Sequence, residues 1–459
     1  MGTGKKVKIH FLGAAETVTG SKYIIDTGDR KIMIDCGLFQ GLKKLRLLNW
    51  DYLPVAIKEI DTVLLTHGHL DHTGYLPRLV KMGYNKSIRG TAPTLDVAEI
   101  ILRDSAKIQE EEAEWANKKG YSKHSLAEPL YTLKDVEKAI HHFKAVPQGQ
   151  WIDLYPEIKA RFQYNGHIIG ATFIELDVHG KRFVFSGDVG RKKDALMKSP
   201  KKPKRADFLF SESTYGNRLH LEIDVEEELK KIVNRTVEKG GILIIPSFAV
   251  ERAQTLMYLF WKLKEKKAIP NIPMIMDSPM GANVLDVFTK NLDWHKLSES
   301  DCQKMCGAFE IVGGFKETLA IVGDRNPKIV IAGSGMVSGG RVLTYLQEYL
   351  DKPETTVLLS GFQAQGTRGR RLMEGAKEIK IYGKYYTVNA EVFNIQALSA
   401  HADQSELLDW MSDIKDKPEK VFLVHGEPHA ADTLRVKIKD TYDWDCEIPE
   451  LYSIVEVSI

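Results

Sequence analysis

Cysteine is scarce in this chain. The four copies, Cys36, Cys302, Cys306 and Cys446, are too few and too scattered for a disulfide framework in 459 residues. Cys302 and Cys306 have the spacing of one helical turn, but neither a second cysteine pair nor a nearby histidine completes a zinc site around them. The sequence therefore predicts reduced thiols that bind no metal.

Long apolar runs are also lacking. No stretch approaches the roughly 18 apolar residues that a membrane span needs, and the start of the chain has no apolar core of the kind found in secretory signals. We therefore expect no membrane association and a cytoplasmic location. The net charge is only +2, which neither requires nor excludes a nucleic-acid partner, because local patches of charge matter more than the sum.

The length and the apolar content predict more than one domain. The chain has 459 residues and is 43% hydrophobic, enough for two or three buried cores. Short strand-like runs dominate the first part and return at the end, whereas the middle alternates regularly between strands and helices, as parallel sheets do. We therefore expect a discontinuous first domain, residues 1–210 and 380–459, with a second domain, residues 211–379, inserted into it.

The densest chemical motif lies directly after a leucine-rich run that predicts a buried strand. His67, His69, Asp71 and His72 fall within six positions, and an apolar pattern from Tyr75 onward predicts a helix behind them. Histidine is the commonest side-chain metal ligand. A mixture of nitrogen and oxygen donors suits zinc best, and manganese or iron less well. The two pairs of ligands predict two metal ions.

Other segments must complete the coordination, because two metal ions need about seven or eight donor atoms. Three further strand-like runs end in a polar residue beside glycine, namely His167, Asp188 and His425. Strand ends are rigid and glycine allows close backbone approach, which suits a metal site at the rim of a sheet. Each residue alone would more often be structural, but the shared pattern favours one common site.

These motifs together resemble the metallo-β-lactamase fold and its dinuclear metal site. The inserted block resembles the β-CASP domain of the nucleic-acid-processing members, and the segments 13–21, 211–216 and 399–403 support this. The resemblance covers essentially the whole chain. It implies an α/β fold in which an αββα metallo-β-lactamase sandwich carries an inserted β-CASP domain of parallel sheet and helices.

The resemblance also implies how two zinc ions would be held. One ion would bind three histidines, the other an aspartate and two histidines, and a second aspartate would bridge the ions. In that order these ligands are His67, His69 and His167, then Asp71, His72 and His425, then the bridging Asp188. Asp35 matches the buried acidic residue of the first motif of the family, where its role would be to orient ligands by accepting hydrogen bonds.

A carboxylate and an imidazole in two further family motifs would complete the catalytic machinery. His401 would give a proton to the departing 3′-oxygen, while Glu212 would orient His401 and raise its pKa. The implied activity is hydrolysis of RNA phosphodiester bonds by water that two zinc ions activate. Internal cutting and 5′-to-3′ digestion both remain open. RNA is favoured over DNA because His425 resembles the RNA-directed members, whereas DNA-directed members tend to carry valine there.

Two glycine-rich loops of the inserted block are the expected contacts to single-stranded RNA. Residues 332–341 join a strand to a helix and could turn backbone N–H groups toward a phosphate, and residues 360–371 add a hydroxyl and three arginines. Tight-turn packing would explain each loop equally well. The residues expected to bind RNA are Ser334, Gly335, Arg341, Gln363, Gln365, Thr367 and Arg368.

Other interpretations stay open. A hydrolase of a small ester or thioester could use the same ligands without Glu212 and His401, and a non-catalytic RNA-processing scaffold is a third alternative. A lysine-rich run at 191–205 is either a surface that attracts a polyanion or a solvated loop. A homodimer is a further expectation from the resemblance.

Overall fold

The computed structural model describes residues 5–119, 126–220, 223–361, 363 and 365–459. The chain forms two compact units. Unit 1 comprises Met1–Asp194, Lys198–Leu219 and His401–Ile459, and unit 2 comprises Ala195–Met197 and His220–Ala400. Residues 380–400, which the predicted boundary assigned to the first domain, lie in unit 2.

Unit 1 is built on two seven-stranded sheets. Each sheet is antiparallel in one half and parallel in the other. The strands of the first sheet, in spatial order, are β22 (Ile454–Ser458), β1 (Lys6–Gly13), β2 (Lys22–Asp26), β3 (Lys31–Ile34), β4 (Ile60–Leu64), β5 (Ile88–Gly90) and β6 (Phe143–Ala145). Those of the second sheet are β21 (Cys446–Glu447), β20 (Lys420–Val424), β11 (Phe208–Glu212), β10 (Lys181–Phe185), β9 (Thr172–Val178), β8 (Ile158–Tyr164) and β7 (Trp151–Tyr155).

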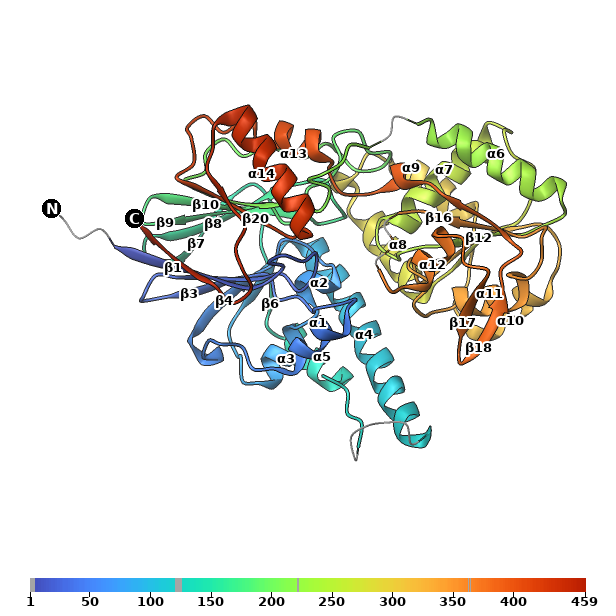
Figure 1. Ribbon diagram of the computed structural model, residues 1–459, viewed down its shortest axis with the longest axis horizontal. Helices are drawn as coiled ribbons and strands as arrows, with labels where there is room; N and C mark the ends of the chain where they lie inside the picture. The colour runs from blue at the N-terminus through green and yellow to red at the C-terminus, as the bar shows by residue number, and fades with distance from the viewer. Residues whose placement is uncertain (1–4, 120–125, 221–222, 362, 364) are drawn as a thin grey trace. The chain divides into compact units, whose positions relative to one another are not determined.

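Three apolar layers hold unit 1 together. Alternating side chains of both sheets meet in a central core, where Phe185 stacks on Phe210 with ring centroids 4.1 Å apart. A second core joins the outer face of the first sheet to helices, and a third does the same for the second sheet. The order of layers is therefore helix, sheet, sheet, helix, and Figure 1 shows α13 and α14 beside the strands β10 and β20.

The helices of unit 1 differ widely in length, and the longest, α4, carries a mostly polar surface away from the core. Their bounds are α1 (Lys43–Leu47), α2 (Leu70–Thr73), α3 (Leu76–Lys81), α4 (Ala92–Lys119), α5 (Leu133–Ile140), α13 (Gln404–Met411) and α14 (Pro428–Tyr442). In the part of the chain described, no helix combines the length and the apolar character needed to cross a bilayer.

Unit 2 contains a six-stranded parallel sheet. Its spatial order is β14 (Glu310–Ile311), β13 (Met274–Asp277), β15 (Ile329–Ala332), β12 (Leu243–Pro246), β16 (Thr356–Leu359) and β19 (Glu391–Asn394). The hairpin of β17 (Glu378–Ile381) and β18 (Lys384–Thr387) forms a separate small sheet. The strands are buried on both faces, as parallel strands between helices are.

Helices flank the sheet of unit 2, with α6, α7 and α9 to one side and α10 and α11 to the other (Figure 1). Their bounds are α6 (Val225–Glu238), α7 (Arg252–Glu265), α8 (Pro279–Lys290), α9 (Glu299–Gly307), α10 (Phe315–Gly323), α11 (Val342–Tyr349) and α12 (Arg368–Met373). The alternation predicted for this block is confirmed.

Candidate metal centre

Strand ends position the side chains of the site, all of which belong to unit 1. His67 follows β4, His167 follows β8, Asp188 follows β10 and His425 follows β20. The turn from β10 to Asp188 depends on Gly187, whose φ is +54° and where an added Cβ would lie 2.7 Å from the Cβ of Thr66. Glycine therefore allows the end of β10 to pack against the histidine-rich loop.

The histidine-rich loop ends in a short helix. His69 caps α2, so Asp71 and His72 lie in the first turn of that helix, earlier than the helix that the sequence predicted from Tyr75 onward. The backbone N–H of Ser21 donates to the Asp71 carbonyl over 2.8 Å, and that of Cys36 donates to the His72 carbonyl over 2.7 Å. The loops after β1 and β3 thus hold α2 through hydrogen bonds to its backbone carbonyls.

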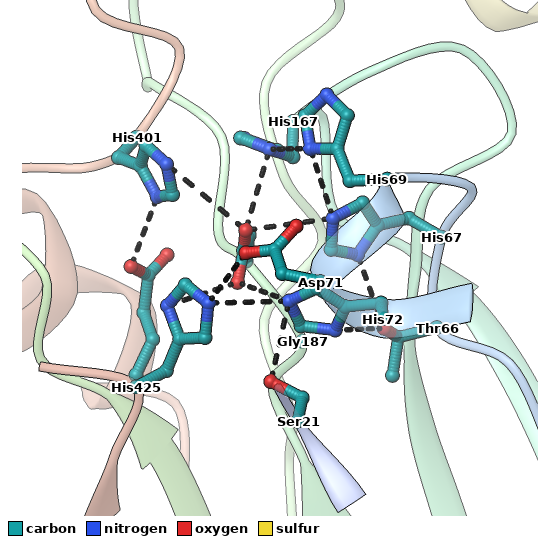
Figure 2. A network of polar contacts seen from close by, with 12 residues as sticks. Ser21, Thr66, His67, His69, Asp71, His72, His167, Gly187, His401 and His425 are labelled. Atoms are coloured by element: carbon teal, nitrogen blue, oxygen red, sulfur yellow. Dashed lines mark hydrogen bonds and ion pairs between the residues drawn. The ribbon is translucent and has the colours of Figure 1, made fainter. Parts of the chain in front are cut away.

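Four donor groups form a first cluster, composed of His67, His69, His167 and Asp188. Nδ1 of His69 lies 3.1 Å from Nε2 of His67 and 3.3 Å from Nε2 of His167. Oδ2 of Asp188 lies 3.4 Å from Nε2 of His67 and 3.5 Å from Nε2 of His167. The ring nitrogens converge on one point, as Figure 2 shows.

A second cluster, of Asp71, His72 and His425, lies on the other side of Asp188. Nε2 of His425 is 3.3 Å from Nε2 of His72 and 3.3 Å from Oδ2 of Asp71. Oδ1 of Asp188 is 3.3 Å from Nε2 of His72. The two oxygens of Asp188 therefore face different clusters, which is the geometry of a bridging carboxylate.

Hydrogen bonds behind two of the rings fix their tautomers. The Thr66 hydroxyl donates its hydrogen to Asp35 over 2.8 Å. Its oxygen also lies 3.1 Å from Nδ1 of His67, and there it can only accept a hydrogen bond from the ring. Nδ1 of His72 donates to the Asp35 carboxylate over 2.7 Å. In their neutral forms both rings therefore carry the proton at Nδ1 and turn the lone pair of Nε2 toward the cluster.

These residues fit metal ions by their chemistry. Nitrogens of the His67, His69 and His167 rings crowd together at close range, and Oδ1 of Asp188 is buried without a hydrogen-bond donor in the part of the chain described. Such an arrangement is costly unless a cation occupies the centre. Burial lowers the pKa of His67 well below its ordinary value and that of His69 to about 4, so both rings are neutral and able to donate a lone pair.

Two residues of the site are held in backbone conformations that side chains disfavour. Asp35 has a φ of +56° and His425 a φ of +48°. Backbone bonds from Asp35 to Leu64 (2.9 Å) and from His425 to Ala14 (2.7 Å) hold them there. Strain of this kind is common where a site needs a particular side-chain direction.

His401 and Glu212 form a pair beside the clusters. Nδ1 of His401 donates to Oε2 of Glu212 over 3.1 Å, while its Nε2 lies 4.0 Å from Oδ2 of Asp188. Glu212 is fully buried, and its other oxygen accepts from the Val189 N–H. Burial alone would lower the pKa of His401, but Glu212 and the nearby aspartates raise it to about 9. The protonated imidazole is thus favoured next to the site.

Three family models match this chain. They describe the metallo-beta-lactamase superfamily over residues 17–94, a Beta-Casp domain over 253–372 and a Zn-dependent metallo-hydrolase RNA specificity domain over 385–449. Ribonuclease TTHA0252 of Thermus thermophilus is 33% identical over 425 residues, which cover 90% of this chain and 92% of that protein. This chain belongs to the β-CASP ribonuclease family. The family consists of metal-dependent hydrolases, and the predicted α/β fold class is confirmed.

Other β-CASP relatives are longer than this chain. The transcription termination factor FttA of Methanocaldococcus jannaschii is 29% identical, and the match covers 94% of this chain but 69% of FttA. The FttA of Methanosarcina mazei is 30% identical, with 92% and 67% covered. A crystal structure of a protein of unknown function from Enterococcus faecalis has the same fold, with a TM-score of 0.55 at 12% identity, covering 98% of this chain and 100% of that one.

In the β-CASP unit, several residues expected to bind RNA are occupied by contacts within the fold. Arg341 donates to the buried carboxylate of Asp277 over 2.6 Å. Arg368 donates to the carbonyls of Lys380 (2.6 Å) and Ser338 (3.0 Å). The Ser334 hydroxyl accepts from the N–H of Gly339 over 3.1 Å. These contacts tie the three side chains to other groups of unit 2.

The remaining expected RNA-binding residues lie in the same two loops. The Gln363 side-chain amide donates to the Gly335 carbonyl over 3.1 Å, so it joins the loops to each other. Thr367 caps α12, and Gln365 is exposed. Phe362 and Ala364, between these positions, lie outside the described residues.

The sequence did not single out two hydroxyl residues that support the ligands. Thr66 bonds both Asp35 and His67, and Thr214 lies 3.1 Å from Nδ1 of His425. The position of Thr66 directly before His67 could have indicated its role. Thr214 lies far from His425 in the sequence, and only its place in the motif at 211–216 could have indicated it. In the lysine-rich run, Lys192 and Lys202 both pair with one carboxylate, that of Asp409.

Proposed function

We propose that this chain is a zinc-dependent ribonuclease that hydrolyses phosphodiester bonds of single-stranded RNA with two ions bound at the clusters around Asp188. The observation that carries the proposal is the bridging position of this carboxylate. Its Oδ2 lies 3.4 Å from His67 and its Oδ1 3.3 Å from His72. A single-ion site would not need two clusters of donors with one shared member.

The proposed ligands follow from these two clusters. The first ion takes three neutral imidazoles, and the second takes Asp71 with two imidazoles, while Asp188 serves both; together these are the ligands His67, His69, His167, Asp71, His72, His425 and Asp188. Nitrogen donors with a minority of carboxylates favour zinc over magnesium or calcium, which prefer oxygen. When bound, the ions would lower the pKa of a water molecule and offset the negative charge that develops on the phosphate.

His401 and Glu212 supply the proton for the leaving group in this proposal. A departing 3′-oxygen is a strong base and needs a proton as the bond breaks. His401 lies within reach of Asp188, and its protonated form, which Glu212 stabilises by accepting Nδ1–H, carries a second proton at Nε2. Glu212 is a positioning residue: it orients the ring and stabilises its charged form.

The substrate class rests on the family. One matched model is described as an RNA specificity domain, and the T. thermophilus relative is named a ribonuclease. Internal cleavage is the primary activity proposed, with 5′-to-3′ digestion as a second activity of the same site. A homodimer is a separate prediction, which sedimentation velocity of the purified protein tests.

Cleavage of single-stranded RNA labelled separately at each end, beside DNA of the same sequence, tests this proposal. We expect discrete internal fragments from RNA that disappear with a chelator and in Asp71→Ala. His141→Ala, which removes an exposed histidine of the same unit, is the matched control and should cleave normally. Intact RNA in all samples together with hydrolysis of a small ester or thioester would refute the proposal, as would RNA cleavage that persists without metal.

Metal analysis separates the roles of the residues. His401→Ala should retain both ions, because the ring faces Glu212 and Asp188 from outside the clusters, but should lose about 100-fold or more in kcat. Asp71→Ala should lose metal and activity together. Retention of full activity by His401→Ala would exclude it as the proton donor and would favour the small-ester alternative.

A further inference from the structure

A buried arginine of unit 2 has N–H donors for which the described residues offer no acceptor. Arg252 is 6% exposed, and among the described residues its Nε and Nη1 have no hydrogen-bond partner. The carboxylate of Glu251 lies 3.5 Å from Nη2, so it takes one end of the guanidinium. Removing charged N–H groups from water without a partner is expensive, which indicates that a ligand completes them.

The arginine is the first residue of α7, at the carboxyl edge of the parallel sheet. The backbone N–H of Arg252 donates back to the Val250 carbonyl over 2.8 Å in a tight turn centred on Glu251. This turn places the guanidinium at the start of a 14-residue helix. The N-terminus of such a helix carries partial positive charge, so the arginine and the helix favour the same kind of ligand, an anion.

Three loops converge on this position. They follow β15, β12 and β16, three adjacent parallel strands in which β15 and β16 lie on opposite sides of β12. The loop after β16 reaches the arginine at Gly361, where an added Cβ would lie 4.0 Å from Nε of Arg252. Parallel sheets bind ligands beyond their carboxyl ends at such a reversal of strand order.

The loop after β15 closes the other side. The Gln363 amide bonds the Gly335 carbonyl over 3.1 Å, and Gly335 packs so closely on Phe248 that an added Cβ would lie 2.6 Å from its ring. Phe248 itself is 41% exposed, although it is four residues from the buried arginine. An exposed aromatic ring beside an anion site is the combination by which proteins hold single-stranded nucleic acid.

We infer that Arg252 binds a backbone phosphate of the RNA strand at the carboxyl edge of the β-CASP sheet. The inference rests on the proposed function for the substrate class, but its residues include none of the metal ligands and all belong to unit 2. Phe248 offers its exposed face to a base. A free phosphate ion has the same chemistry, so the test must distinguish it from a strand.

Binding measured in the presence of a chelator tests the inference without cleavage. We expect Arg252→Met, which keeps most of the side-chain volume, to bind a labelled single-stranded RNA about 10-fold or more weakly than the full-length wild type. Losing one phosphate contact should reduce the slope of log affinity against log salt by about 0.7. An oligonucleotide with uncharged methylphosphonate linkages should bind wild type and variant equally.

Two further variants make the result specific. Arg235→Met removes an arginine that pairs with Glu391 at the opposite, amino edge of the sheet, and should leave affinity unchanged. If the methionine variant does not fold, Arg252→Lys replaces it, because lysine keeps a positive charge beside Glu251. This variant should still weaken binding to RNA but not to the uncharged strand. Circular dichroism and thermal unfolding verify that each variant is folded.

Wild-type affinity in both Arg252 variants would overturn the inference, as would equal weakening toward charged and uncharged strands, which would indicate a structural role. Thermal stabilisation by inorganic phosphate that depends on Arg252, with unchanged RNA affinity, would also overturn it in favour of a free ion. A protein that binds RNA through Arg252 yet cleaves none would refute the proposed nuclease activity and leave this inference standing.

Discussion

The Asp35 carboxylate accepts the Nδ1–H of His72 over 2.7 Å and, at the same time, two hydrogen bonds from Thr66, one from its N–H and one from its hydroxyl, each over 2.8 Å. Its acceptor capacity is therefore committed to groups that orient metal ligands. Because only an acceptor can hold the proton at Nδ1, this contact decides which nitrogen of His72 faces the metal.

Asp35→Asn tests that dependence. An amide can keep the bond from the Thr66 N–H only by turning its NH₂ group toward His72, which would move the ring proton to Nε2 and block the lone pair. We expect the affinity for one of the two ions to fall by about 10- to 100-fold, with activity falling in parallel. Zinc titration with metal analysis measures it.

Asp61→Asn is the matched control, since Asp61 also accepts several hydrogen bonds in unit 1 but lies near the start of β4, away from the ligand-bearing end. It should retain both ions. Two ions bound with wild-type affinity in Asp35→Asn would show that Asp35 does not set the tautomer of His72.

Glu212→Gln should change the pH dependence of cleavage. A proton donor works only while it holds its proton, so the rate falls as pH rises through the pKa of His401, which Glu212 helps to raise to about 9 in the metal-free protein. Bound cations would lower the pKa of His401, but removing the negative charge of Glu212 would still lower that pKa further. We expect the alkaline fall to move toward lower pH by about one unit.

The profile of kcat against pH measures the shift, with metal content determined for both proteins. Equal metal content and an alkaline limb at the same pH in wild type and Glu212→Gln would contradict the assignment of His401 as the acid.

Arg341→Met should destabilise unit 2. Asp277 is fully buried and accepts from Arg341 (2.6 Å), Tyr345 (2.7 Å) and Thr318 (3.2 Å). Without the arginine its charge has no counterion among the described residues, and breaking a buried pair from one side costs about 3–5 kcal/mol. Urea unfolding of the two proteins measures the loss.

A second substitution separates stability from RNA contact. Asp277→Asn in the Arg341→Met background removes the uncompensated charge and should recover part of the stability. If RNA affinity also returns to the wild-type value, Arg341 acts through the fold rather than by touching RNA.

The sequence could predict the strand ends of the site because ligand and strand are neighbours in the chain. His67 after β4 and Asp188 after β10 need only a local pattern of apolar residues, glycine and a polar side chain. The residue roles for His401 and Glu212 came from the resemblance to a family and remain predictions. The structure adds that the two side chains form a hydrogen bond over 3.1 Å.

Partners far apart in sequence could not be predicted. Arg341 and Asp277 come from different strand–helix units, and only the register of β13 beside β15 brings the two together. The sequence therefore does not reveal that the guanidinium of Arg341, a residue expected to bind RNA, donates to Asp277 within the fold. The buried donors of Arg252 were equally invisible, because a sequence gives neither burial nor unsatisfied hydrogen bonds.

Lys22 provides a prediction about stability. Its ammonium is buried, donates to the carbonyls of Gly20 (3.0 Å) and Gly37 (2.5 Å), and faces the ring of Phe39 at 4.4 Å. Burial lowers its pKa from 10.5 to about 8. Between these values the unfolded chain holds a proton that the folded protein does not, so this group makes the free energy of unfolding rise with pH.

Lys22→Met removes that contribution while filling a similar volume. The penalty for the buried charge is complete below about pH 8 and gone above about pH 10.5, a difference of about 3 kcal/mol. The stability of wild type relative to Lys22→Met should therefore increase by about that amount as pH rises through this window, whatever the other groups contribute to both proteins. Chemical unfolding at several pH values measures it, with Lys58→Met as the comparison for an exposed lysine. A constant difference between wild type and Lys22→Met would mean that Lys22 remains protonated in the fold, held by its two carbonyl acceptors.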